Sequence, residues 1–128
     1  MRMILIYICI SLTFISCEEY NEDVFEIVGT YDGNTIGFND SFIITIASDY
    51  RDDIIIEAPF DGQIYDVVIA DVDCEDCDLK EIDIDWQEVD RNVYIQGTGA
   101  YSFGTIQIDY EIEIFGVSST YTMIGSKY

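Results

Sequence analysis

The sequence predicts an all-β domain, an antiparallel meander of about eight strands that closes as a small barrel or flattens as a sandwich. Two observations lead to this prediction. Apolar and polar residues alternate with period two over most of the chain after residue 23, whereas amphipathic helical spacing is hard to find. Short clusters of Gly, Asn, Asp, Ser and Pro separate the alternating segments, as expected for turns between strands.

The first half of the domain contains four expected strands. Segments 24–31, 41–48, 53–58 and 65–72 are rich in the β-branched and aromatic residues that favour strands. Turn sequences separate them at 32–34 (Asp-Gly-Asn), 48–52 and 59–62 (Pro-Phe-Asp-Gly). The segments around Ile43 and Val67 are apolar on both faces, which indicates a central position in a sheet or an interface.

The second half alternates more regularly. In Thr105–Phe115, isoleucines and Tyr110 occupy one face, while Gln107, Asp109, Glu111 and Glu113 occupy the other, solvated face. Trp86 has the phase of Ile82 and Ile84, so we expect it in the core rather than on an exposed sugar-stacking platform. Further strands are expected at 92–97 and 120–126, with a turn at 100–104.

The N-terminus resembles the signal peptide of a bacterial lipoprotein. Arg2 is followed by thirteen uncharged residues, fewer than the roughly 20 that a membrane-spanning helix needs. Residues 14–17 (Phe-Ile-Ser-Cys) resemble a lipobox, with Phe14 in place of the usual leucine. We therefore expect a signal peptide at 1–16, a lipid-carrying Cys17 with a tether over 17–23, and a single β-domain at 24–128. The alternative is an ordinary cleaved signal peptide.

Charge and composition exclude several functions. Without Arg2, four basic residues remain against 26 acidic ones, a formal charge of −22. This balance disfavours nucleic acid and anionic lipid as partners, and favours basic partners or weak divalent cation binding. The chain has no histidine, which removes the usual Ser–His and Cys–His catalysis and His-ligated metal sites. We expect no enzymatic activity and no cofactor.

Several segments resemble the small all-β lipoproteins of Bacteroidota-type bacteria. These are 28–33 (Val-Gly-Thr-Tyr-Asp-Gly), the hairpin 93–99 leading into 106–112, and the closing Gly125-Ser126-Lys127. Glu18 and Glu19 resemble the acidic signal that sends such lipoproteins to the outer face of the outer membrane. The resemblance implies an outer-membrane lipoprotein, either surface-exposed or in the periplasmic leaflet. Because the wider group includes lipocalin-like barrels, it also implies a carrier of a small apolar ligand as an alternative function.

Cys74 and Cys77 lie where a hairpin turn is expected. Across such a turn the Cα atoms are about 5.5 Å apart, a distance that a disulfide can bridge, and an exported compartment favours oxidation. The surrounding carboxylates disfavour the thiolate that a redox pair needs. A structural disulfide is therefore favoured over a metal-binding thiol pair and over a redox pair.

The densest acidic run is the candidate divalent cation site. It lacks the glycine and the terminal Glu of a calcium-binding loop, so a solvated acidic loop is the alternative. Its members are Asp71, Asp73, Glu75, Asp76 and Asp78.

Tyr94 and Tyr101 flank a glycine-rich hairpin and are the candidates for an exposed binding surface. The sequence thus predicts a non-enzymatic binding or scaffolding domain with a protein partner. A lipocalin-like carrier would instead need an interior cavity on the order of 300 Å³.

Overall fold

The computed structural model describes residues 22–49, 51–73 and 79–128, and these form one closed, eight-stranded antiparallel barrel. Each strand pairs with the next in sequence, and β8 closes the barrel on β1. The predicted all-β meander is confirmed, in its barrel form. The elements are α2 (Glu22–Ile27), β1 (Gly29–Thr35), β2 (Phe42–Ser48), β3 (Asp53–Ala58), β4 (Asp66–Asp73), β5 (Lys80–Asp90), β6 (Val93–Ser102), β7 (Thr105–Ile114) and β8 (Val117–Lys127).

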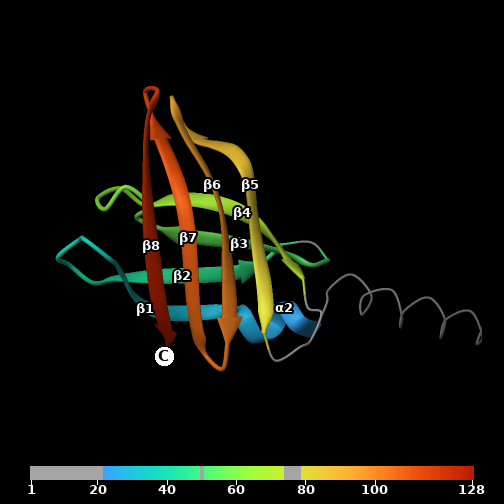
Figure 1. Ribbon diagram of the computed structural model, residues 1–128. Coiled ribbons are helices and arrows are strands. Elements are labelled where there is room, and N and C mark those ends of the chain that lie inside the picture. Colours follow the sequence, from blue (N-terminus) through green and yellow to red (C-terminus); the bar gives the residue numbers. More distant parts are fainter. Residues whose placement is uncertain (1–21, 50, 74–78) are drawn as a thin grey trace, which may run out of the picture.

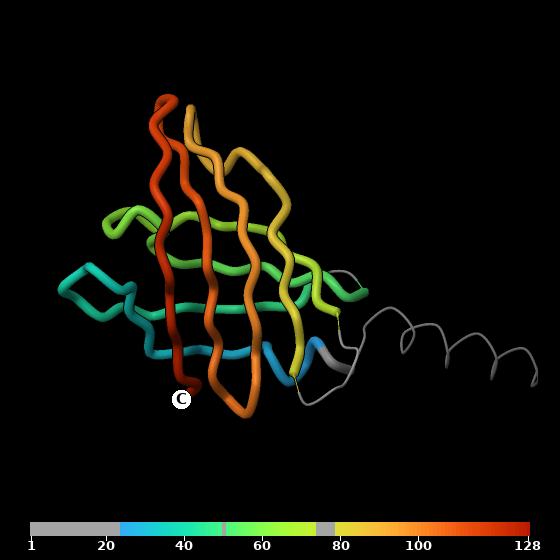
Figure 2. Tube along the Cα trace, viewed as in Figure 1, coloured from blue at the N-terminus to red at the C-terminus, as the bar shows by residue number. Residues whose placement is uncertain are grey.

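The barrel has a short half and a long half. Strands β1–β4 contain six to eight residues each, whereas β5–β8 contain ten or eleven. Figure 1 shows β5–β8 passing in front of β1–β4 at a steep angle and extending beyond them at one end. The trace in Figure 2 follows the same crossing, with the β5–β6 and β7–β8 turns at the projecting end. The outer face of β5–β8 therefore extends beyond the part of the barrel that β1–β4 form.

The interior of the barrel is packed with side chains. Inward positions alternate with more exposed outward positions along β1–β4 and most of β7, as the period-two pattern requires. Two buried tyrosines donate hydrogen bonds to backbone carbonyls, Tyr31 to Ile27 and Tyr110 to Phe60, and burial raises the pKa of both phenols. The buried apolar strand residues are Tyr31, Ile44, Ile46, Ile54, Ile56, Ala58, Val68, Ala70, Val72, Ile82, Ile84, Ile95, Tyr101, Ile106, Ile108, Tyr110, Ile112 and Met123.

Two expectations for the first strand are wrong. Residues 24–27 are helical, because Val24 and Ile27, three positions apart, both turn their side chains into the core from one face of a helical turn. The expected turn at 32–34 lies within β1, where Gly33 leaves room for the Ile44 side chain. Among the described residues, no helix has the length and apolar character needed to cross a membrane.

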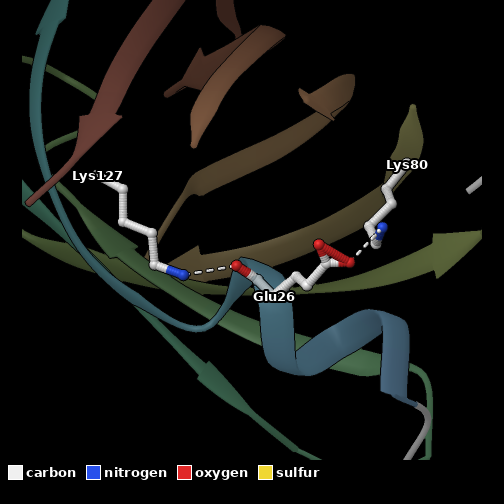
Figure 3. Close-up of polar contacts among 3 residues, drawn as sticks. All are labelled: Glu26, Lys80 and Lys127. Carbon is white, nitrogen blue, oxygen red and sulfur yellow. Dashed lines mark hydrogen bonds and ion pairs between the residues drawn. The ribbon is translucent and has the colours of Figure 1, made fainter. Parts of the chain in front are cut away.

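Helix α2 is held against one end of the barrel by two lysines (Figure 3). Lys80 Nζ lies 2.9 Å from the carboxylate Oε1 of Glu26, and Lys127 Nζ donates a 2.6 Å hydrogen bond to the Glu26 backbone oxygen. The Lys80 side chain is buried, whereas that of Glu26 is largely exposed. This helix, which begins at Glu22 within the expected tether at 17–23, is therefore fastened to β5 and β8.

Strands β4 and β5 share the shortest ladder of the barrel. They pair over only three positions, from Asp71–Asp83 to Asp73–Glu81. Beyond these pairs, the Gln87 carboxamide replaces a strand partner, since its Oε1 accepts from Ile69 N (3.0 Å) and its Nε2 donates to Ile69 O (2.9 Å). The Gln87 side chain thus satisfies the backbone N–H and C=O of Ile69, where β4 and β5 no longer pair.

We expect Gln87→Leu to lower the free energy of unfolding by about 2 kcal/mol, because it removes both hydrogen bonds to Ile69. Urea denaturation measures the change. Gln107→Leu, at an exposed position on the outer face of β7, is the control and should cost much less. Equal losses in the two variants would contradict a closing role for Gln87.

Candidate functional site

An open groove with a volume of about 830 Å³ runs across the outer face of β5–β8. Most of its polar side chains are outward-pointing residues of these four strands, and Trp86 and Ile36 stand at opposite margins. Trp86 belongs to β5, while Ile36 follows β1 and is hydrogen-bonded to Thr122 of β8. The lining consists of Ile36, Asp83, Ile84, Asp85, Trp86, Gln96, Gly97, Thr98, Asp109, Tyr110, Glu111, Thr120, Tyr121 and Thr122.

Strand register arranges the polar side chains of the groove in rows. Asp83, Thr98, Asp109 and Thr122 are direct cross-strand neighbours from β5 to β8. Thr122 Oγ1 donates to Asp109 Oδ1 at 2.7 Å within this row. In the next row, Gln96 Nε2 donates to Glu111 Oε1 at 2.8 Å. These bonds orient two of the four groove carboxylates, the others being those of Asp83 and Asp85.

The lining of the groove contains four carboxylates and no basic side chain. Lys80 and Lys127 contact α2 at the end of the barrel, and Arg51 and Arg91 lie in the β2–β3 and β5–β6 turns. The groove therefore has a concentrated negative potential, which attracts positively charged groups.

Trp86 and Tyr94 form a parallel stacked pair, with ring centroids 5.3 Å apart and an interplanar angle of 7°. The expectation of a core position for Trp86 is wrong, since 46% of this residue is exposed. A β-bulge between Ile84 and Gln87 changes the phase of β5, so that Trp86 no longer shares the inward face of Ile84. Tyr94, expected on a binding surface, is half-buried beside Trp86.

The expectation that Tyr101 is exposed is wrong, because only 7% of it is accessible. Strand β6 continues to Ser102, so Tyr101 keeps the inward phase of Ile95 and lies opposite Ile106. The turn begins only at Phe103, whose side chain is exposed. Of the two tyrosines predicted for a binding surface, Tyr101 is therefore buried and only Tyr94 remains a candidate.

Of the predicted cation ligands, Asp71 and Asp73 lie on the outer face of β4. Asp71 is the cross-strand neighbour of both Asp53 and Asp83. Within the described part of the chain, no group of three or more metal-ligating side chains is placed to hold an ion. Cys17, Cys74, Glu75, Asp76, Cys77 and Asp78 lie outside the described residues, so the lipidation and disulfide predictions remain predictions.

A hydrogen bond with Asp71 is the main cause that raises the pKa of Asp53 to about 6, followed by burial and by the negative charges of Asp71, Asp52 and Asp49. The folded state therefore binds this proton more tightly than the unfolded chain does. Its contribution to stability is present at low pH and is lost as the pH rises from about 4 through 6.

We expect Asp71→Asn to raise the melting temperature at about pH 7.5 and to have a much smaller effect at about pH 5. The amide donates to Asp53 without needing the shared proton, so the gain appears only where that proton is lost. Asp32→Asn, whose neighbours on the adjacent strands are Ile43 and Ser126, controls for the general relief of charge repulsion. A gain from Asp71→Asn that is the same at both pH values would contradict a shared proton.

The geometry suits recognition of a group that carries both positive charge and hydrogen-bond donors. Carboxylates accept hydrogen bonds from such a group, and the face of an indole ring attracts a cation.

In comparisons with known proteins, no family model, no curated protein and no solved structure matches this chain.

Proposed function

We propose that this protein is a lipid-anchored binding domain of the bacterial cell envelope, without enzymatic activity, and that its outer β5–β8 groove binds a positively charged partner. One observation carries the proposal: four carboxylates line one open groove that contains no basic side chain. A cationic partner would supply the missing charge, and electrostatic attraction would speed its association.

The anchor is proposed to be a lipid on Cys17, which places the domain at the outer membrane, on its surface or in its periplasmic leaflet. The chain from such an anchor would enter the barrel through α2, which Lys80 of β5 and Lys127 of β8 hold at Glu26. Replacing Cys17 with Ala should move the protein from the detergent phase to the aqueous phase. A variant that stays with the membrane would contradict acylation.

The alternative of a lipocalin-like carrier receives less support. Inward side chains fill the barrel, including Tyr31, Phe60 and Met123, each with no accessible surface. The β5–β8 groove lies outside the wall, and a second hollow of about 620 Å³ lies between the connections at 37–43 and 59–65. Of the buried core residues, only Ile84 and Tyr110 reach the lining of the β5–β8 groove, and none reaches that of the second hollow.

Binding of a fluorescent oligolysine peptide to the processed protein tests the proposal. Asp83→Asn combined with Asp109→Asn should weaken binding roughly tenfold at low salt, since two charge contacts of about 0.7 kcal/mol each are lost. Asp32→Asn combined with Glu57→Gln changes the net charge equally at exposed sites outside the groove, and should have little effect. Equal weakening by both pairs would mean that total charge, and not the groove, determines binding.

A further inference from the structure

We infer that the Trp86–Tyr94 stack is a docking platform for an arginine side chain, and that the partner is therefore an arginine-containing peptide segment. This inference rests on the proposed function of the β5–β8 groove and specifies the chemistry of its ligand.

The first step is the placement of the indole. Trp86 lines the groove, whereas Tyr94 does not, so the tyrosine covers one ring face and the accessible part of Trp86 faces the groove. Tyr94 is half-buried and braces the indole in a fixed orientation, which reduces the side-chain entropy that binding would otherwise cost. The pair is thus a pre-formed flat surface.

The second step is the backbone that turns the indole outward. The bulge between Ile84 and Gln87 interrupts the β5–β6 ladder, and the adjoining seam with β4 is completed by the Gln87 side chain. Bulges commonly re-aim a side chain beside a functional site.

An arginine side chain fits both the exposed indole and the carboxylates beside it. A planar guanidinium can stack on an indole and at the same time donate paired hydrogen bonds to a carboxylate, such as that of Asp85 or Glu111 in the same groove. A lysine ammonium is a compact, strongly hydrated charge with no planar face to stack. A neutral sugar could stack on the ring but would leave the carboxylates without a counter-charge, so arginine is favoured.

The experiment uses the intrinsic fluorescence of Trp86, which is the only tryptophan in the chain. The processed protein is titrated with two peptides of equal length and charge, one with arginine and one with lysine at every basic position. We expect the arginine peptide to bind about fivefold more tightly and to change the emission of Trp86 more strongly. In Trp86→Ala, followed through a label on the peptide, the preference for arginine should disappear, while Trp86→Phe should retain part of it.

Phe103→Ala is the matched control, because Phe103 is an exposed aromatic residue outside the groove, and it should keep the full preference. Equal affinity for both peptides would overturn the arginine platform and leave the proposed function standing. Failure of both peptides to bind would overturn the proposed function itself. Saturable quenching of Trp86 by a linear glucan, with no binding of either peptide, would overturn both the arginine platform and the cationic partner. It would indicate a carbohydrate site instead.

Discussion

Glu26→Gln is expected to lower the free energy of unfolding by about 3 kcal/mol, a large effect for a side chain that is mostly in solvent. The reason lies in its partner. The Lys80 side chain is 2% exposed, whereas that of Glu26 is 61% exposed, so the variant leaves a buried ammonium without its carboxylate. Removing the carboxylate of such a pair takes away the Coulombic attraction that offsets the desolvation cost of the buried ammonium. Urea denaturation followed by circular dichroism measures the loss.

Removing the lysine should have the smaller effect. Lys80→Met keeps the length of the buried side chain without its charge, and the Glu26 carboxylate that remains is solvated. Glu26→Gln combined with Lys80→Met should therefore recover most of the stability lost in the single variant. The hydrogen bond from Lys127 to the Glu26 backbone is available in every variant, so it does not affect the comparison. If Lys80→Met were as unstable as Glu26→Gln, removing the exposed partner would not cost more than removing the buried one, contrary to this prediction.

The strands were predictable because their alternation is local. Thr105–Ile114 places Ile106, Ile108 and Ile112 inward and Asp109 outward, as its period of two requires. Helix α2 (Glu22–Ile27) was not predictable, since six residues are too few to separate helical from strand periodicity. Only its packing on the end of the barrel decides between the two.

The candidate site was predictable only in part. The outward positions of Asp109 and Glu111 follow from alternation, but their alignment with Asp83, Gln96 and Thr98 depends on cross-strand register, which comes from closure of the barrel. The outward position of Trp86 could not be predicted, because a bulge places two residues of β5 opposite one residue of β6. The sequence of a single strand does not contain this relation. Tyr101 was misplaced because β6 runs past its expected end.

Glycine positions in β6 determine how closely β6 approaches β7, and Gly97→Ala should therefore be strongly destabilising. A methyl group at Gly97 would lie 2.4 Å from the carbonyl oxygen of Asp109 and 2.8 Å from Cα of Tyr110. Both are backbone atoms, so relief requires the two strands to move apart. We expect a loss of about 3 kcal/mol, which the better strand propensity of alanine offsets only in small part.

Gly33→Ala provides the comparison that separates a backbone clash from a side-chain clash. Its methyl group would first meet Cδ1 of Ile44 at 2.5 Å, an atom at the end of a side chain, so Ile44→Val should recover part of the stability. At Gly97 the nearest atom is the Asp109 backbone oxygen, and the one side-chain atom among the three nearest is Cβ of Tyr110 at 2.8 Å. Truncating Tyr110 to alanine keeps this Cβ, so it should give no recovery in a Gly97→Ala background. Recovery on that truncation would mean that ring packing, and not strand approach, requires glycine at this position. If strand approach is the cause, Gly97→Ala should also weaken peptide binding under conditions where the variant is still folded, because Gly97 and Asp109 both line the groove and the rows of carboxylates depend on β6–β7 register.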